Sequence, residues 1–324
     1  MTTISLTHRR PLAARLGPPL VAGLLLACAF VGLFTAAVHA PRPNGVGVAV
    51  VAPAPMERQL DRGLDRAVPG GFDLERYRSA PAARRALLDQ RVSGVLVVAG
   101  ARPTLLVASA AGAPTAEAVR GAFAAAVGRR LAVVDARPLP ANDGRGLSAF
   151  FLVAGTTVAS VLFGALLFFF ARGVDARVRV GALIGFAVLA GLIVALTADV
   201  VVGALTGAFL AVAGLTALLA LAVAAPTAAL TQLLGLPGVG LSALVLMLVA
   251  LPSSGGPVGA QLMPGFYETL THALPGGAAL TALRSAVYFD GAAIWGLVAV
   301  LGAWAVAGLV VELAAAGRRQ REAA

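Results

Sequence analysis

The chain has 324 residues, of which 59% are hydrophobic and only 12% are charged, and its mean hydropathy is +0.89. A soluble domain of this length could not bury so much apolar surface, so the composition indicates a membrane protein. Every basic residue is arginine, and the formal net charge is +10. Without lysine the chain can hold no GxxxxGK[ST] phosphate-binding loop. The arginines lack the interleaved aromatic residues of a nucleic-acid surface, so no nucleic-acid partner is expected.

Six apolar runs are about 20 residues long, the length that crosses the hydrocarbon core of a bilayer. They are Pro18 to Val38, Ala149 to Ala171, Val178 to Ala198, Val200 to Ala225, Leu233 to Leu251 and Ala292 to Ala315. The third and fourth runs are nearly continuous and must turn back, and we expect this turn around Asp199. Regular helix is also expected to break in a loop with Pro226 and at Leu236 to Gly238.

Arginine clusters predict the orientation, because arginine marks the cytoplasmic flanks of membrane spans. They precede the first run, follow the second and follow the last, so six spans place both termini in the cytoplasm of a plasma-membrane protein. The expected parts are a cytoplasmic tail (1–17), a first span (18–38), an extracytoplasmic domain (41–146), a five-helix membrane domain (147–316) and a second tail (317–324). The first run exceeds the usual signal-peptide core of about 7 to 15 residues, so an uncleaved anchor is favoured over cleavage after Ala40.

The segment from Pro41 to Gly146 has a different pattern. Four short runs rich in β-branched residues and bounded by glycine or proline predict strands: "GVGVAVVAP", "VSGVLVVAG", "PTLLVASA" and "RLAVVDARP". Helical segments lie between them, from Met56 to Val68, in "SAPAARRALLDQR" with a Ser79 cap, and in "PTAEAVRGAFAAAVGRR". Alternating strands and helices predict a small α/β domain inserted between the first two spans.

The stretch "LPSSGGPVGAQLMPGFYETLTHALPGG", which starts at Leu251, interrupts the pattern before the last span. Its prolines and glycines exclude a continuous helix. Helical spacing then returns twice, at Leu262, Phe266 and Leu270 and at Leu280, Leu283 and Val287. Non-helical backbone at membrane depth must be surrounded by protein or water. We therefore expect residues 252–289 to form an outer re-entrant hairpin.

Particular residues are candidates for shaping and holding this hairpin. Its bends are assigned to five residues: Gly255, Gly256, Pro257, Pro264 and Pro275. Glu268 and Arg284 are candidates for holding the hairpin in place, and a plain interfacial role is favoured over one in an outer gate.

Titratable groups are too few and too scattered to predict a catalytic or metal site. None of the histidines, His8, His39 and His272, has a partner at metal-ligand spacing, and the single Cys28 lies in an apolar run. Glu312, in the last span, is expected to lie near the cytoplasmic arginines around Arg318. The chain is therefore expected not to be an enzyme and to need no cofactor.

The sequence from Leu251 to Phe289 resembles the outer segment of type-2 ABC transporter permeases, in particular the YhgE/Pip-like branch. "VAVVAPAP", "ARRALLDQRVSGVLVV" and "LVASAAG" resemble the soluble insert of that branch, and "NDGRGLSAFF" resembles the start of its second span. The resemblance implies a six-helix permease that works as a homodimer or heterodimer with a separate ATPase. The loop "ARGVDARVRV" would then be the cytoplasmic coupling loop, although it is short for that role. Its candidate residues are Arg172, Asp175, Arg177 and Arg179.

Two functional hypotheses follow. The leading one is a permease subunit of an ABC-type exporter that moves an amphiphilic or envelope-related substrate outward. The alternative is a non-transporting envelope or surface protein whose extracytoplasmic domain binds a ligand or partner. An intramembrane enzyme is disfavoured, because the spans contain no polar pair at a plausible spacing.

Overall fold

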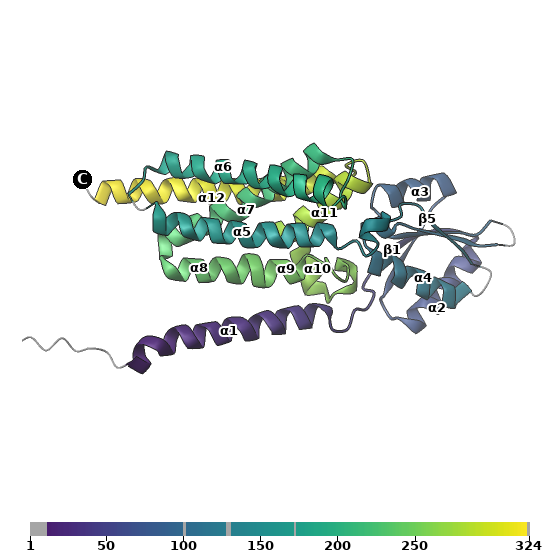
Figure 1. Cartoon of the computed structure of the whole chain (residues 1–324). Coiled ribbons are helices and arrows are strands. Elements are labelled where there is room, and N and C mark those ends of the chain that lie inside the picture. Colours follow the sequence, from purple (N-terminus) through teal and green to yellow (C-terminus); the bar gives the residue numbers. More distant parts are fainter. Residues whose placement is uncertain (1–11, 100–101, 128–130, 172, 323–324) are drawn as a thin grey trace, which may run out of the picture.

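The computed structural model describes residues 12–99, 102–127, 131–171 and 173–322. A bundle of long helices carries an α/β domain at one end, and the first and last described residues, Leu12 and Glu322, lie toward the opposite end of the bundle (Figure 1). The single long helices are α1 (Leu12–Val38), α5 (Ser148–Phe170), α6 (Ala176–Leu196), α7 (Phe209–Leu234) and α12 (Ile294–Glu322). One more is assembled from α8 (Leu236–Ser242), a π-helical segment (Ala243–Val249) and α9 (Ala250–Ser253).

Five stretches of the described chain are long and apolar enough to cross a membrane. They are Ser148–Phe170, Ala176–Val201, Phe209–Leu234, Leu236–Ser253 and Ile294–Ala315. Helix α1 contributes a shorter apolar stretch, Gly23–Val38. Large apolar side chains such as Leu189, Ile193 and Val310 are exposed on the bundle. Such a surface is suited to contact with lipid, because a water-facing surface would carry polar side chains there.

The turn between the third and fourth apolar runs lies later than expected. Helix α6 continues as a π-helical turn (Thr197–Val201) that contains Asp199, and the chain reverses over residues 202–208. Gly203 and Gly207 have φ of 68° and 89° in this connection, which glycine adopts without strain. Because the whole run is apolar, it carried no periodic signal that could place the turn.

The predicted loop at Pro226 is wrong, because Pro226 lies inside α7 and is buried. Proline is tolerated inside membrane helices where neighbouring helices surround the interrupted backbone. The break occurs instead at Gly235, which has φ of 68° and separates α7 from α8. At the chain ends, α1 and α12 extend into both predicted tails, from Leu12 and to Glu322.

Helix α7 is the centre of the bundle and packs against α5, α6, α11 and α12. Each of three neighbouring helices presents a glycine to its backbone: Gly164 of α5, Gly191 of α6 and Gly308 of α12. A Cβ at any of the three positions would overlap α7 backbone atoms, at Ala224, Ala213 and Pro226 respectively. These small residues therefore allow close helix approach.

We expect Gly308→Val to separate α12 from α7 and to destabilise the bundle by about 1 to 3 kcal/mol. The matched control is Gly302→Val on the same helix, since a Cβ at Gly302 meets nothing within 4 Å. Thermal unfolding of the two purified variants in detergent measures the difference. Equal melting temperatures would contradict the close α7–α12 packing.

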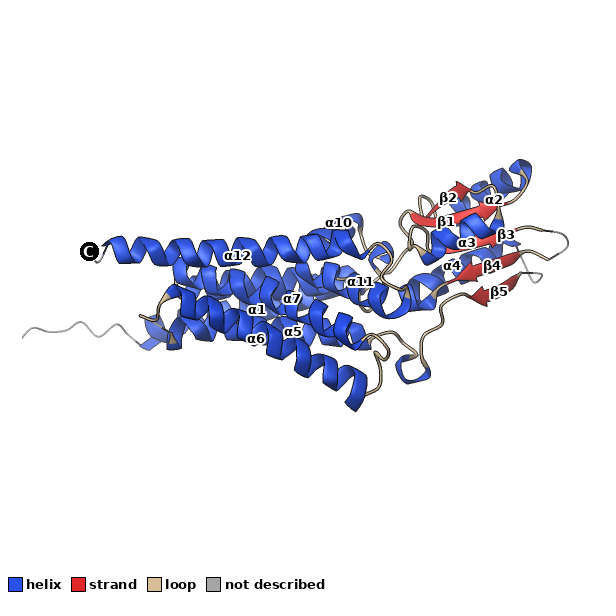
Figure 2. Ribbon diagram, turned by 90° about the horizontal axis from the view of Figure 1, so that it is seen from above, coloured by secondary structure: helices blue, strands red, loops and turns tan. Residues whose placement is uncertain are grey.

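The α/β domain contains a mixed five-stranded sheet in the order β2-β1-β3-β4-β5 (Figure 2). Its strands are β1 (Val46–Val51), β2 (Phe72–Arg76), β3 (Gly94–Val97), β4 (Thr104–Val107) and β5 (Ala132–Asp135). Strand β1 is parallel to β2 and β3, with Val48 opposite Leu74 and Gly94, whereas β3 and β4 are antiparallel and β4 and β5 are parallel. The alternation of strands and helices thus gave the correct domain class.

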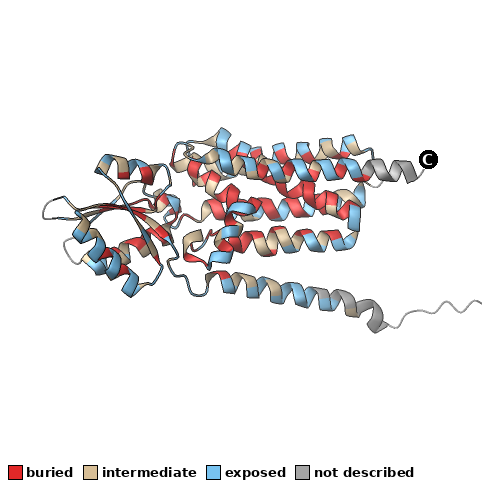
Figure 3. Cartoon of the chain, turned by 180° about the vertical axis from the view of Figure 1, so that it is seen from behind, coloured by how far each residue is buried: buried red, intermediate tan, exposed pale blue. Residues whose placement is uncertain are grey.

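Helices cover both faces of this sheet. They are α2 (Ala54–Ala67), α3 (Ala80–Leu88) and α4 (Ala113–Val127). Leu60 of α2 and Phe123 of α4 share one buried cluster with β-strand residues, while Ala83 and Leu87 of α3 belong to the cluster on the other face. Figure 3 shows the buried residues concentrated inside the sheet layers and along the bundle axis.

Strand β2 was not predicted, because three of its five residues are charged. The alternation of apolar and charged residues could have indicated this strand, because Phe72 and Leu74 pack toward the α2–α4 face while Asp73 and Glu75 are exposed. The predicted cap of α3 is confirmed, because the Ser79 hydroxyl accepts a hydrogen bond from the Ala82 amide at 3.4 Å.

Candidate functional site

The predicted hairpin forms the junction between the bundle and the α/β domain. It contains two short helices, α10 (Gly265–Ala273) and α11 (Pro275–Tyr288), preceded by a loop with a single 3-10 turn, Ala260–Leu262. Neither helix is long enough to cross a membrane, and α11 is buried against α5, α7 and α12. The hairpin is therefore part of the bundle core at the domain end.

The loop before α10 contributes side chains to the core of the α/β domain. Val258 and Leu262 are 8% and 4% exposed and belong to the cluster beneath α2 and α4. Phe289, just after α11, is 3% exposed and belongs to the cluster beneath α3. Both cores of the domain are thus completed by residues that follow α9 in the sequence. Removing the domain would expose these three apolar side chains, so its deletion is not a clean test of its role.

Hydrogen bonds reinforce the same junction. The Arg42 and Asn44 amides donate to the carbonyls of Leu262 and Gln261, both at 3.0 Å. The Ser93 hydroxyl, next to β3, donates to the Gln261 side-chain oxygen at 2.6 Å. The segment before β1 and the loop before α10 are therefore held side by side.

Arg284, one of the predicted gate residues, lies at the centre of this junction. Its guanidinium donates to the carbonyls of Ala111 in the α/β domain and Gly146 before α5, both at 3.3 Å, and to Gly256 in the hairpin at 3.4 Å. The planar guanidinium is suited to this task, because its donors point in several fixed directions. One side chain thus connects three segments that are distant in the sequence.

Burial is the largest influence on the pKa values of Arg284 and of the nearby Tyr288. It lowers the pKa of Arg284 to about 10, partly opposed by the nearby Tyr288 and Asp143, so the guanidinium stays charged at neutral pH. Burial also raises the pKa of the Tyr288 hydroxyl to about 12, with a further increase from Asp143. Asp143, which was not singled out from the sequence, is 7% exposed and accepts from the Leu147 and Ser148 amides at the start of α5. The Asp143 carboxylate therefore holds the start of α5 by hydrogen bonds and interacts electrostatically with the Arg284 guanidinium.

A cavity of about 180 Å³, with Arg284 in its lining, lies between the domain and the hairpin. Glu268 and His272, one turn apart on α10, line it together with Gln90 and Thr115 of the domain. Pockets for drug-sized ligands have volumes of about 300 to 1,000 Å³, so this one suits water rather than an amphiphilic substrate. Glu268 and Arg284, the two residues singled out from the sequence, thus line one cavity.

The predicted bends are used in different ways. Gly255 has φ of 71°, and a Cβ at Gly256 would overlap the ring of Phe150 on α5. Pro264 is the N-cap of α10 and Pro275 lies in the first turn of α11, where proline is favoured. Pro257 is exposed. The predicted apolar face of α10 is wrong, because Phe266 is 69% exposed while Tyr267 and Thr271 are buried.

Gly259 is a further bend that sequence reasoning missed. Its φ is 89°, and a Cβ there would overlap the hydroxyl oxygen of Thr115 on α4. We expect Gly259→Ala to weaken the docking of the α/β domain, because both the backbone strain and the overlap must be relieved. Gly291→Ala is the matched control, since φ at Gly291 is 77° and a Cβ there meets nothing within 4 Å. Limited proteolysis of the intact protein compares them, and equal cleavage of both variants would contradict this role of Gly259.

The three described candidate coupling residues do not form one loop surface. Arg172 lies outside the described residues. Asp175 is the N-cap of α6 and accepts from the Arg177 amide at 2.7 Å, and the Arg177 side chain is exposed. Arg179 was predicted in the loop, which is wrong: it lies within α6 and its side chain is only 6% exposed.

Arg179 forms a buried ion pair with Glu312 of α12. The guanidinium lies 2.7 Å from the Glu312 carboxylate, whose side chain is fully buried. The arginine that pairs with Glu312 is thus Arg179, whereas the side chain of Arg318, the expected neighbour, lies outside the described part of the chain. The sequence did contain a sign of this ion pair, because a carboxylate inside an apolar span requires a partner.

Within the described residues, no group of three or more His, Cys, Asp or Glu side chains is arranged to hold a metal ion. No protein-family model, curated protein or solved structure matches the chain. The functional argument therefore depends on the geometry of the junction, the far end of the bundle and the α/β domain.

Proposed function

We propose that the chain is a multi-pass permease subunit of an ABC-type exporter in the plasma membrane. It would use six spans, counting α1, with both termini in the cytoplasm. The substrate class is amphiphilic or envelope-related, and a separate ATPase supplies the energy. The observation that supports this most directly is the junction, where the hairpin before the last long helix is continuous with the bundle core and with both cores of the α/β domain.

Such a junction suits a transporter because movement of helices would be transmitted to the outer domain. Val258, Leu262 and Phe289 couple the two parts through packing, and Arg284 couples them through hydrogen bonds. Well-packed contacts of this kind transmit displacement rather than absorbing it. Helix α1 also contacts the hairpin, because the Tyr267 hydroxyl of α10 donates a hydrogen bond to the carbonyl of Leu33 in α1 at 3.1 Å.

The ATPase would bind at the end of the bundle opposite the α/β domain. That end is formed by the α5–α6 connection, the α7–α8 break at Gly235 and the last turns of α12. Arg177 offers an exposed positive charge there for an acidic partner surface. A second permease chain, identical or similar, would complete the assembly.

Affinity purification of the full-length protein from native membranes tests this proposal. We expect an ATPase to copurify, Arg177→Glu to reduce its recovery, and Arg102→Glu, an exposed change in the α/β domain, to leave it unchanged. Native mass spectrometry of the same material reports whether two permease chains are present. If no ATPase copurifies and reconstituted protein moves no amphiphile with ATP, the proposal is wrong.

A non-transporting surface protein is the second candidate. The observation that favours it is a cavity of about 540 Å³ in the α/β domain, within the usual range for ligand pockets. Because deletion of the domain would expose the three junction side chains, point changes in this cavity are the better test. A receptor should lose its response when they are introduced, whereas an exporter should keep basal transport.

A further inference from the structure

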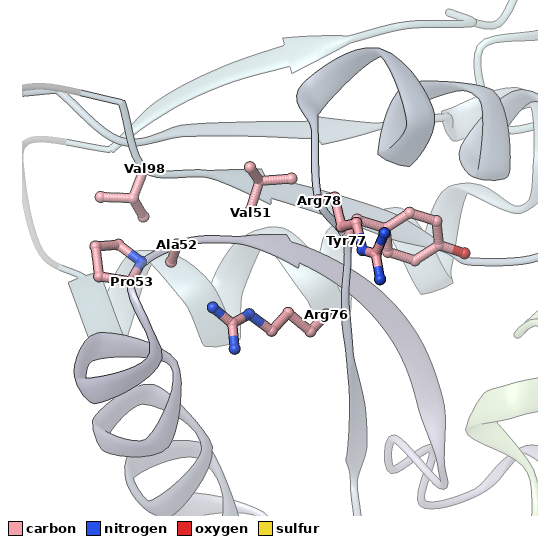
Figure 4. A pocket seen from close by; sticks show the side chains of 7 residues that line it. All are labelled: Val51, Ala52, Pro53, Arg76, Tyr77, Arg78 and Val98. Atoms are coloured by element: carbon pink, nitrogen blue, oxygen red, sulfur yellow. The ribbon is translucent and has the colours of Figure 1, made fainter.

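The cavity of about 540 Å³ lies at the carboxyl ends of three adjacent parallel strands (Figure 4). Strand β1 ends at Val51, β2 at Arg76 and β3 at Val97, and the cavity is lined by the residues at or just beyond these ends. The lining residues are Val51, Ala52, Pro53, Arg76, Tyr77, Arg78 and Val98. Their positions give the cavity an apolar wall and a basic wall.

The strand order explains why a hollow forms at this place. From β1 the chain crosses through α2 to β2 on one side, and from β2 it crosses through α3 to β3 on the other side of β1. Because α2 and α3 cover opposite faces of the sheet, the connections diverge beyond the end of β1. Open α/β sheets bind ligands in the crevice at such a switch point. The carboxyl ends of these strands face away from the bundle, because the opposite end of β1, where the strand starts, is next to the hairpin.

The basic wall is available to an added anion. Arg76 extends toward the turn between β1 and α2, and Arg78 lies beside Tyr77 in the same view (Figure 4). Arg76 is 60% exposed and its Nε lies 3.5 Å from the Glu57 carboxylate, so this pair is solvent-screened and weak. Arg78 is also exposed. Two carboxylates lie nearby: Glu57, which pairs with Arg76, and Glu75, which accepts a hydrogen bond from the Tyr77 hydroxyl at 3.3 Å. An anion would therefore be held by the directed donors of the two exposed guanidiniums rather than by a large excess of positive charge.

The composition of the domain points to the same class of ligand. Residues 41 to 146 contain 15 arginines and nine acidic residues, so the domain attracts anions. Beside the arginines, Val51, Pro53 and Val98 offer an apolar surface. A ligand that uses both walls has one negative group and a short apolar part.

We propose that this cavity binds a small organic monoanion, with its carboxylate or phosphodiester group at Arg76 and Arg78 and its apolar part against Val51 and Val98. Guanidinium groups recognise both anions through paired hydrogen bonds. Binding here does not depend on transport, so the site would serve either proposed function.

Calorimetric titration of the full-length protein in nanodiscs of zwitterionic lipid tests the site. The probes are hexanoate, dibutyl phosphate and, as a neutral match, hexanamide. We expect one or both anions to bind, hexanamide not to bind, and Arg76→Gln/Arg78→Gln to weaken binding at least about tenfold, because charge-assisted hydrogen bonds are lost. The control variant Arg84→Gln, on α3, changes an arginine that is also exposed but lies outside the cavity, and it should bind as the unchanged protein does.

Two further comparisons make the outcome unambiguous. Equal melting temperatures of the variants show that the exposed changes leave the fold intact. The two anionic probes identify the class of ligand: tighter binding of dibutyl phosphate assigns the site to a phosphodiester, and tighter binding of hexanoate assigns it to a carboxylate. If neither anion binds, or if the double variant binds both as tightly as the unchanged protein, the proposed site is wrong.

Discussion

Replacing Arg179 or Glu312 singly is expected to destabilise the bundle by about 3 to 5 kcal/mol, because each change leaves the other charge buried without its partner. The pair connects α6 to α12 at 2.7 Å, and both helices pack against α7. Arg179→Met and Glu312→Leu should therefore each lower the melting temperature in detergent markedly. This is the largest effect of any single side-chain change that we expect in the membrane region.

The double variant Arg179→Met/Glu312→Leu should recover most of the lost stability, since apolar replacement of both partners of a buried pair is often neutral or stabilising. Arg177→Met, two residues earlier and exposed, is the control and should change little. A double variant as unstable as the single ones would show that the pair contributes more than mutual neutralisation. In that case other contacts of Glu312 must matter.

The double variant also separates stability from function. A buried pair between two helices can fix one packing arrangement at the cost of stability. Under the exporter proposal, a folded double variant that still binds the ATPase but exports poorly would assign the pair to the conformational cycle. Unchanged export would assign it to folding alone.

The sequence predicted those features that depend on local pattern. Apolar length marked the helices, β-branched runs marked β1, β3, β4 and β5, and Ser79 marked the start of α3. Each of these signals lies within one continuous segment of the chain, so no tertiary information was needed.

The features that sequence reasoning missed depend on contacts between distant segments. Val258, Leu262 and Phe289 are apolar residues in a broken stretch, and nothing local shows that they complete the cores of another domain. The Arg179–Glu312 pair likewise joins the first turn of one span to the last turns of another. A uniformly apolar run also hid the position of the α6–α7 turn, because a helix buried or lipid-covered all round has no polar face to set its register.

Replacing Arg284 by methionine is expected to loosen the junction by about 2 kcal/mol, because three carbonyls lose a charged donor. The effect should be local, since Ala111, Gly146 and Gly256 belong to three segments that meet at this side chain. Arg284→Lys should recover only part of it, because an ammonium cannot reproduce the flat, divergent donors of a guanidinium. Hydrogen exchange of the intact protein, followed by mass spectrometry, would detect faster exchange near these three carbonyls.

Arg137→Met is the matched control, since Arg137 also joins the domain to the end of the hairpin, through Asp290 at 2.8 Å. That pair is exposed and should contribute less than about 1 kcal/mol. If Arg284→Met and Arg137→Met accelerate exchange equally, the Arg284 guanidinium is not the connection that holds the junction. If only Arg284→Met does so, and if it reduces export while the ATPase still copurifies, then the junction couples the outer domain to the bundle and Arg284 is its positioning residue.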